Sequence, residues 1–311
     1  MPDSKPAILI VQPHLGVLSP FLEPDFTVWR LWEAPPLEAT QKIGALVVAG
    51  EFPLDTALAE HLPNLGLIAS FTAGYEGVDI AWAAERGLKV SHSPGVNHED
   101  VADLAIGLML AAWRGLIEGD AVVRRGLWRP TEKRLTLSLG GHRLGVVGLG
   151  AVGEAVARRA EAFGLDVAWW GPDETPDTRW PRAESLLALA QESDILVVAA
   201  SPADALGRLI DREVIEALGP AGLLVNVAQG GLVDEAALIA ALKDGRLGMA
   251  ALDVFAAEPT PAARWADVPN VVLSPHTGGA TSAAIPKMVA LTRENLRRFF
   301  AGEPLANPVV G

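Results

Sequence analysis

Residues 144–153 read Leu-Gly-Val-Val-Gly-Leu-Gly-Ala-Val-Gly, an apolar run that leads into three glycines, Gly148, Gly150 and Gly153. This G-x-G-x-x-G spacing, where a strand should turn into a helix, is typical of a dinucleotide-binding site. The first glycine makes the turn, the second lets the backbone approach a pyrophosphate, and the third lets helix and strand pack closely. Phosphate would then lie at the helix N-terminus, where unpaired N–H groups favour an anion. Glycine-rich strand ends also occur for packing reasons alone, so the motif by itself leaves that alternative open.

Strands and helices alternate from this motif onward. The expected strands are 144–148, 166–170, 195–199, 223–227, 249–253 and 271–273, and the expected helices are 152–163, 184–191, 212–218 and 235–244. Six strands with interposed helices are what a doubly wound nucleotide-binding domain requires. A last helix, over about 282–300, is long enough to leave that domain and return to the first part of the chain.

The residues before the motif show a similar alternation. The expected strands are 7–11, 45–49, 67–70 and 88–91, with helices at 54–61 and 80–85. Such alternation predicts an α/β fold with a second parallel sheet and crossover helices. Pro94 and Gly95 indicate an interdomain linker over 93–97, and Asn97 can cap the next helix. That helix, 101–114, is almost wholly apolar, which predicts that it is buried on all sides between domains or in a subunit contact.

Length and composition limit the function. A chain of 311 residues is long for one core and suggests two domains. A net charge of −13 leaves no basic footprint, so nucleic acid is not an expected partner. No apolar segment approaches the roughly 18 to 20 residues that a membrane helix requires, and the run at 7–11 is too short for a signal peptide. With no cysteine there is no disulfide or thiolate chemistry, which fits a cytoplasmic location, and no His/Cys/Asp cluster has the spacing of a metal site.

Residues suited to chemistry follow several of the expected strands. Gln229, Asp253, Glu258 and His276 come after three strands of the second sheet. The carboxyl ends of parallel strands share one edge, so these side chains can converge although they are far apart in sequence. In the first sheet, the loop 71–79 occupies the same kind of position; its glycines either help to bind a ligand or only turn the chain.

With these motifs the chain resembles the D-isomer-specific 2-hydroxyacid dehydrogenases, and within them the hydroxypyruvate, glyoxylate and hydroxyphenylpyruvate reductase branch. The resemblance covers nearly the whole length and is carried, in order, by Ala73–Asp79, Val101–Ala105, Gly148–Gly153, Asn226–Gly230, Leu252–Phe255 with Glu258-Pro259, and Ser274–Gly279. It implies an NAD(P)-dependent oxidoreductase that interconverts a small 2-oxo acid and its D-2-hydroxy acid. It also implies two Rossmann-like doubly wound domains. The nucleotide-binding domain (97–283) is then inserted in a flavodoxin-like substrate domain (1–96 and 284–311), to which the C-terminal helix returns.

The resemblance implies a role for each matching residue. His276 stands where the family protonates the substrate oxygen, and Glu258 where a glutamate holds that imidazole. The pKa of an ordinary histidine, near 6.5, suits the task. The backbone N–H groups of Ala73, Gly74 and Tyr75 would bind the substrate carboxylate. The implied cofactor-binding residues are Gly148, Leu149, Gly150, Ala151, Val152, Gly153, Asp173, Val227, Ala228, Asp253, Gly278 and Gly279. Tyr75, Trp128 and Trp265 could border the substrate, although packing is the more common role of tryptophan.

The chain departs from the family at Gln229, where the family carries an arginine that binds the substrate carboxylate and carbonyl. Glutamine keeps an amide donor but loses the charge and the two-pronged geometry. A charge-assisted contact is worth about 1.5–3 kcal/mol, so turnover on ordinary 2-oxo acids is expected to be weak. Engineering, a changed natural substrate and a cofactor-binding sensor or scaffold with little turnover would each explain the substitution.

The cofactor is expected to be NAD, with NADP as the alternative. Asp173 follows the strand 166–170, where an acidic group suits the 2′-hydroxyl of NAD and would repel the 2′-phosphate of NADP. Arg179 and Arg182 lie close enough in sequence to reverse this preference. The family and the apolar helix 104–113 together lead us to expect a homodimer.

Overall fold

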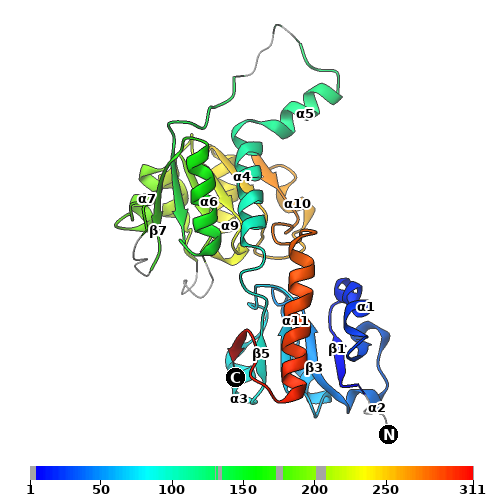
Figure 1. Cartoon of the computed structure of the whole chain (residues 1–311). Coiled ribbons are helices and arrows are strands. Elements are labelled where there is room, and N and C mark those ends of the chain that lie inside the picture. The colour runs from blue at the N-terminus through cyan, green and yellow to red at the C-terminus, as the bar shows by residue number, and fades with distance from the viewer. Residues whose placement is uncertain (1–4, 130, 132–134, 173–177, 201–207, 311) are drawn as a thin grey trace. The chain divides into compact units, whose positions relative to one another are not determined.

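The computed structural model describes residues 5–129, 131, 135–172, 178–200 and 208–310. The chain forms two compact units. Unit 1 consists of Met1–Asn97 and Thr281–Gly311, and unit 2 consists of His98–Ala280. Each unit contains a six-stranded sheet with helices around it, so the predicted α/β fold with two sheets is confirmed (Figure 1).

The sheet of unit 1 has the order β12-β5-β4-β3-β1-β2. Its strands are β1 (Ala7–Ile10), β2 (Thr27–Arg30), β3 (Ile43–Val48), β4 (Leu67–Ser70), β5 (Lys89–Ser91) and β12 (Pro308–Val310). The first five pair in parallel, and β12 is antiparallel to β5. The order 2-1-3-4-5 is the flavodoxin-like arrangement, in which ligands gather at the switch point between β1 and β3.

Several elements of unit 1 differ from the sequence-based expectation. The expected helix 54–61 is a 3-10 helix, η3 (Thr56–His61), which begins where Asp55 accepts a hydrogen bond from the Ala57 N–H. Neither β2 nor β12 was predicted, because each is short and gains its stability from pairing. The other helical elements are η1 (Pro13–Leu18), α1 (Ser19–Leu22), η2 (Leu31–Glu33), α2 (Leu37–Thr40), α3 (Ile80–Glu85) and α11 (Ala284–Ala301).

The C-terminal helix α11 belongs to unit 1, as predicted. It packs against β4, and its last two aromatic residues press on the sheet. A Cβ at Gly44 would come within 2.7 Å of the Phe300 ring, and one at Gly66 within 2.7 Å of the Phe299 ring. Glycine at these two positions therefore lets the helix approach the sheet closely.

The sheet of unit 2 is entirely parallel and has the order β11-β10-β9-β8-β6-β7. Its strands are β6 (Arg143–Val147), β7 (Asp166–Trp170), β8 (Ile195–Val198), β9 (Leu223–Asn226), β10 (Met249–Leu252) and β11 (Val271–Leu273). All six agree with the expected positions to within one residue at either end. Because β6 has β7 as its neighbour on one side and β8 on the other, the switch point lies between β6 and β8. The glycine motif follows β6 and therefore lies beside this switch point.

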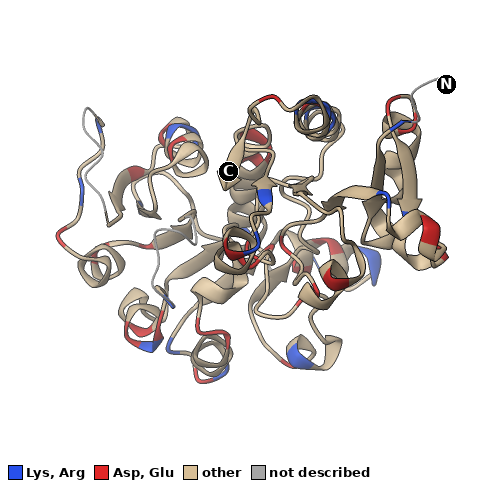
Figure 2. Ribbon diagram, turned by 90° about the horizontal axis from the view of Figure 1, so that it is seen from below, with Lys and Arg blue, Asp and Glu red and all other residues tan. Residues whose placement is uncertain are grey.

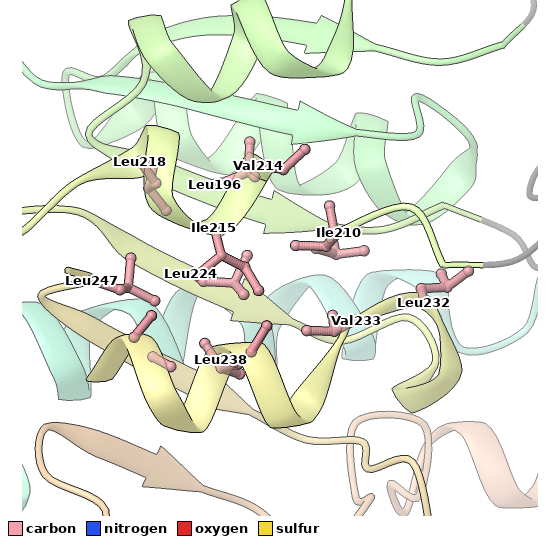
Figure 3. Packing of buried hydrophobic residues seen from close by; sticks show 14 of the residues in the cluster. Leu196, Ile210, Val214, Ile215, Leu218, Leu224, Leu232, Val233, Leu238 and Leu247 are labelled. Atoms are coloured by element: carbon pink, nitrogen blue, oxygen red, sulfur yellow. The ribbon is translucent and has the colours of Figure 1, made fainter. Parts of the chain in front are cut away.

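Helices cover both faces of this sheet. The described helical elements of unit 2 are α4 (His98–Trp113), α5 (Leu116–Arg124), α6 (Ala151–Ala162), α7 (Leu186–Glu192), α8 (Arg212–Leu218), η5 (Gly230–Leu232), α9 (Glu235–Lys243) and α10 (Ala262–Trp265). One buried cluster joins α4 and α6 to the sheet, and a second joins α7, α8 and α9 to the other face. Figure 3 shows part of the second cluster, where Leu224 of β9 packs among Ile215 of α8 and Leu238 of α9.

Within its own unit, the apolar helix α4 is buried on one side, and its expected contact with a second subunit stays a prediction. Ala102, Ala105 and Met109 are fully covered because α4 packs against α6 and against β9 and β10 of its own unit. Leu104 and Leu110 lie on its half-exposed side, and Gly107 is exposed.

Two further features concern the surface. Acidic and basic residues are interspersed along the helices of both units (Figure 2). Within the described residues, no helix is both long and apolar enough to cross a membrane, and no three His, Cys, Asp or Glu side chains are grouped so that they could hold a metal ion.

Candidate active site

The glycine motif has a different steric requirement at each of its three glycines. Gly148 has φ +88°, and a Cβ there would lie 2.4 Å from the Ala200 Cα. A Cβ on Gly153 would lie 1.9 Å from the carbonyl oxygen of Gly148, so this residue permits the close packing of α6 on β6. A Cβ on Gly150, the N-cap of α6, would meet nothing within 4 Å. Open space at Gly150 and a helix N-terminus beside it fit the pyrophosphate of a dinucleotide.

His276 and Glu258 form a hydrogen-bonded pair at the carboxyl edge of this sheet. The Nδ1 of His276 lies 2.6 Å from Oε2 of Glu258, and the N–H of Phe255 donates to Oε1 at 2.9 Å. Burial would raise the pKa of Glu258, but the hydrogen bonds from His276 and Phe255 and the charge of the imidazole outweigh it and lower that pKa. An ionised Glu258 accepts a hydrogen bond from the Nδ1–H of His276, which fixes the orientation of the imidazole.

The loop that carries His276 is held by Asp253, whose side chain is 2% exposed. Its two carboxylate oxygens accept the N–H groups of Thr277 at 2.9 Å and Gly278 at 2.8 Å, and its carbonyl accepts the His276 N–H at 2.9 Å. His276 itself has φ +53°, a left-handed conformation that is uncommon outside glycine. A conformation of this kind persists where surrounding contacts require it, and here Asp253 supplies them.

Gln229 lies on the same edge, directly after β9. The buried Asn226 holds the turn because its Nδ2 donates to the Gln229 carbonyl at 3.0 Å while its Oδ1 accepts the Ala228 N–H at 3.1 Å. A Cβ on Gly230 would lie 1.9 Å from the Phe255 carbonyl carbon, so the turn packs directly on the loop that leads to Glu258. The Gln229 side chain is half-buried and makes no hydrogen bond to any residue that the structure describes.

A further residue, Glu235, joins these two loops and was not predicted from the sequence. It is 7% exposed, accepts the Ala256 N–H at 2.7 Å and forms an ion pair with Arg264. Nothing in the local pattern marks Glu235, because it follows the helix cap Asp234 and reads as an ordinary first-turn glutamate. Trp265, suggested as a possible border of the substrate, is instead buried against Phe255.

In unit 1, the loop after β4 presents a row of backbone N–H groups. Among the described residues, no acceptor receives the N–H of Ala73, Gly74 or Tyr75. Their carbonyls are held inward, because Ser70 Oγ donates to the Gly74 oxygen at 2.8 Å and the His92 ring lies 2.8 Å from the Ala73 oxygen. Successive unpaired N–H groups of this kind bind anions.

Gly77 does more than turn the chain. A Cβ on Gly77 would lie 1.9 Å from the Phe52 carbonyl oxygen, so glycine lets this loop pack on the segment after β3. The residues that hold the loop, Ser70, Thr72 and His92, were not predicted from the sequence. Two hydroxyl residues at the end of an apolar strand are the one signal that could have indicated them.

The ribose end of the expected cofactor site is only partly described. Asp173 lies outside the described residues. Arg182 donates to the Gly171 carbonyl at 2.7 Å and lies over the Trp169 ring at 5.6 Å. Arg179 forms an ion pair with Glu161. Both arginines therefore have partners within unit 2.

Comparison with known proteins decides which family has this arrangement. The profile described as D-isomer specific 2-hydroxyacid dehydrogenase, NAD binding domain, matches residues 106–278, more than half of the chain. The chain belongs to this family. It is 40% identical over 309 residues to the hydroxyphenylpyruvate reductase of Plectranthus scutellarioides, with 97% of this chain and 98% of that protein covered. It is also 40% identical over 308 residues to glyoxylate/hydroxypyruvate reductase A of Arabidopsis thaliana, with the same coverage.

Solved structures agree with the assignment of this dehydrogenase. A 2-hydroxyacid dehydrogenase from Ketogulonicigenium vulgare has a TM-score of 0.90 and 40% identity and covers 99% of both chains. An NADPH-dependent glyoxylate/hydroxypyruvate reductase from Sinorhizobium meliloti, in complex with NADP and malonate, has a TM-score of 0.89 and 34% identity, with 99% of this chain and 97% of that chain covered. The predicted family, fold and enzyme class, an NAD(P)-dependent oxidoreductase, are thus confirmed.

Proposed function

We propose that this dehydrogenase reduces a small 2-oxo acid of the glyoxylate or hydroxypyruvate type to its D-2-hydroxy acid. The observation that carries the proposal is the hydrogen bond of 2.6 Å between His276 and Glu258. This pair lies at the carboxyl edge of a parallel sheet whose strand order is typical of nucleotide-binding domains. The names of the relatives, hydroxyphenylpyruvate reductase and glyoxylate/hydroxypyruvate reductase, support the substrate class.

In the proposed reaction, His276 acts as the acid. Glu258 stays ionised because its pKa is lowered, so it favours the protonated imidazole, which donates a proton from Nε2 to the substrate oxygen. A bound reduced nicotinamide supplies the hydride. The Ala73, Gly74 and Tyr75 N–H groups hold the substrate carboxylate, and the Gln229 amide offers one neutral donor where the family has an arginine.

We infer that one part of the chain binds the cofactor and the other part binds the substrate. Residues 97–283 form the dinucleotide-binding domain, and residues 1–96 with 284–311 form the substrate domain. The cofactor residues would be the glycine motif 148–153, the turn Val227-Ala228 and the loop Gly278-Gly279. Asp253 would contribute by holding that loop, since both of its carboxylate oxygens already accept backbone N–H groups.

We infer that NAD is preferred over NADP. An acidic Asp173 after β7 would repel a 2′-phosphate, and the partners of Arg179 and Arg182 within unit 2 compete with such a phosphate. The ratio of the two dissociation constants, measured by fluorescence titration, tests this preference. In an Asp173→Ala variant, the dissociation constants of NAD and NADP should be closer to each other than in the unaltered protein. If the unaltered protein binds NADP more tightly than NAD, the inferred preference is wrong.

We infer further that the chain forms a homodimer through the segment that follows α4. Helix α5 stands away from the sheet of unit 2 (Figure 1). The segment exposes Leu116, Ile117, Val123, Leu127 and Trp128, each by more than half of its surface. Several exposed apolar side chains within one segment are typical of a protein interface.

The test of the function is oxidation of NADH and NADPH with glyoxylate and hydroxypyruvate as substrates. His276→Ala should lower kcat by about 10²–10⁴-fold, the usual contribution of a general acid. The exposed His61 provides the matched control, and His61→Ala should leave kcat unchanged. Equal rates in the two variants would contradict the assignment of His276.

Gln229 favours a second candidate, a nucleotide-binding sensor with little turnover. The intact His276–Glu258 pair argues against it, because a protein without turnover has no chemical use for that pair. Dinucleotide binding without turnover of either substrate, even after Gln229→Arg, would support the sensor.

A further inference from the structure

Three consecutive carbonyl oxygens in the loop after β4 accept hydrogen bonds from within unit 1. The Thr72 carbonyl accepts the Ser93 N–H at 3.0 Å, and the Gly74 carbonyl accepts the Ser70 hydroxyl at 2.8 Å. The carbonyl between them, that of Ala73, has a single partner among the residues that the structure describes, and this partner is a histidine ring.

These contacts decide where the N–H groups of the loop point. In a trans peptide group, the carbonyl and the N–H of the next residue point in opposite directions. A carbonyl that is held by the protein therefore turns the next N–H away from the residues that hold it, which here applies to the N–H groups of Ala73, Gly74 and Tyr75. Packing agrees with this direction, because a Cβ on Gly50 would lie 2.3 Å from the Gly74 carbonyl oxygen.

His92 supplies the contact in the middle of the loop. Its Nδ1 lies 2.8 Å from the Ala73 carbonyl oxygen, and because a carbonyl can only accept, Nδ1 carries the proton. The ring also meets Tyr75 edge-on, with the ring centres 5.2 Å apart. His92 follows β5, which pairs directly with β4, and its N–H donates to the Asn307 carbonyl at 3.2 Å. The imidazole is thus anchored from the neighbouring strand.

We propose that His92 is a positioning residue for the substrate carboxylate. Through its hydrogen bond to the Ala73 carbonyl, it turns the peptide group so that the Gly74 N–H points at the bound anion. This inference rests on the proposed function, in which the loop binds the substrate carboxylate. The hydrogen bond from Nδ1 carries the role, whereas the edge contact with Tyr75 contributes packing.

Two substitutions separate the hydrogen bond from the packing. In His92→Asn, the amide nitrogen is bonded to Cγ, as Nδ1 is, so the donor is kept and the ring is lost. In His92→Leu, an apolar side chain still packs on Tyr75 but no donor remains. We expect His92→Leu to raise KM for glyoxylate by about tenfold or more, because one hydrogen bond to a charged group is lost or misaligned.

The other kinetic values should change little. In His92→Leu, kcat should stay within about threefold, because the carboxylate is held equally in the ground state and in the transition state. In His92→Asn, both KM and kcat should stay within about threefold of the unaltered protein. A role in packing alone predicts the reverse order of the two variants, with the larger loss in His92→Asn.

Binding of oxalate to the full-length protein, measured by titration calorimetry, gives a readout that needs no turnover. Oxalate presents a carboxylate but has no oxo group to accept a hydride. Its dissociation constant should rise by about tenfold or more in His92→Leu and should stay within about threefold in His92→Asn. The exposed His61 of the same unit supplies the control, because His61→Leu should change neither KM nor oxalate binding. Thermal melting should show that the variants are folded.

The outcomes distinguish this inference from the proposed function. If the unaltered protein reduces glyoxylate and His92→Asn weakens binding as much as His92→Leu does, or if neither variant weakens it, the role of His92 is wrong although the proposed function stands. If the unaltered protein binds oxalate as expected but reduces neither glyoxylate nor hydroxypyruvate, the proposed function fails, and the two variants still decide whether His92 positions a bound carboxylate. Absence of both oxalate binding and turnover would overturn both.

Discussion

The substitution of one residue, Gln229, weighs most on the activity of this dehydrogenase. Its backbone is held firmly by Asn226, and Gly230 packs against Phe255, so the side chain is presented at the same edge as His276. The turn is therefore built to place a side chain there, and what is missing is the charge. Glutamine can donate one neutral hydrogen bond, whereas arginine can grip a carboxylate with two charged ones.

Gln229→Arg should raise kcat/KM on glyoxylate and hydroxypyruvate by about ten- to a hundredfold. The reason is a regained charge-assisted contact worth about 1.5–3 kcal/mol. Gln229→Lys restores charge without the forked geometry, so its gain should be smaller. Steady-state kinetics on the three proteins provide the measurement, and no gain in either variant would show that position 229 does not limit activity.

The glycine motif allows a second comparison between single residues. Gly150→Ala should weaken cofactor binding by about tenfold or more, because a methyl group would enter the open space beside the N-terminus of α6. The free energy of unfolding of this variant should differ from that of the unaltered protein by less than about 0.5–1 kcal/mol, because the added methyl group meets no other atom. Titration calorimetry and urea unfolding measure the two effects.

Gly153→Ala is the matched control for this comparison. A Cβ there would lie 1.9 Å from the Gly148 carbonyl oxygen, so overpacking should destabilise the protein by about 1–3 kcal/mol. Equal stability of the two variants would contradict the division of roles between Gly150 and Gly153.

At the scale of elements, the active edge of unit 2 consists of loops that hold one another. Asp253, at the end of β10, fixes the loop after β11, and Glu235, at the start of α9, fixes the loop before Glu258. Each contact joins residues more than 20 positions apart in the sequence. The geometry of the His276–Glu258 pair therefore depends on the packing of neighbouring strands.

Asp253→Ala should destabilise unit 2 and lower kcat together. It leaves the buried Gly278 N–H without its acceptor, at a cost of about 1–3 kcal/mol, and it releases the loop that carries His276. Asp253→Asn keeps one acceptor oxygen, so its stability and its kcat should lie between those of Asp253→Ala and those of the unaltered protein. Chemical unfolding and kcat are the measurements. A loss of cofactor affinity with unchanged stability would show instead that Asp253 contacts the cofactor directly.

At the scale of the whole molecule, the acidic surface makes stability depend on pH. The pKa of Asp25 is lowered mainly by its hydrogen bond from Arg293, and that of Asp234 mainly by the N–H of Ala237. A carboxyl whose pKa is lower in the folded state contributes stability that is fully present above its unfolded pKa. This stability is lost as the pH falls through the folded value.

Stability should therefore be nearly constant from neutral pH to about pH 5 and should fall below about pH 4, where ordinary carboxyl groups take up protons. Asp234→Asn tests one contribution, because asparagine still caps α9 while it removes the charge. The free energy of unfolding of this variant, measured with urea over this pH range, should fall less steeply as the pH is lowered. If the variant and the unaltered protein lose stability equally at low pH, the role given to Asp234 is wrong.

Assembly provides the last prediction at this scale. The double variant Ile117→Glu with Val123→Glu should convert the proposed dimer into monomers, since it places charges in the exposed apolar segment. Val17→Glu is the control, because Val17 is 70% exposed but lies in unit 1. Analytical ultracentrifugation measures the masses. A monomeric unaltered protein, or an unchanged dimer in the double variant, would contradict the proposed interface.

The sequence by itself determined the alternation of strands and helices, the six strands of the second sheet and the position of the glycine motif. These features depend on local periodicity and on the conformational freedom of glycine, which neighbouring residues along the chain reveal. The family motifs further indicated His276 and Glu258 as partners, and the structure brings them to hydrogen-bonding distance.

Only the tertiary structure decided which residues hold that site in place. Asp253 accepts N–H groups from the loop after β11, and Glu235 accepts the Ala256 N–H; both contacts join segments far apart in the chain. The same holds for β2 and η3, which differ from the sequence-based expectation. Local patterns report which residues prefer burial, whereas the order of strands in each sheet decides which of them meet.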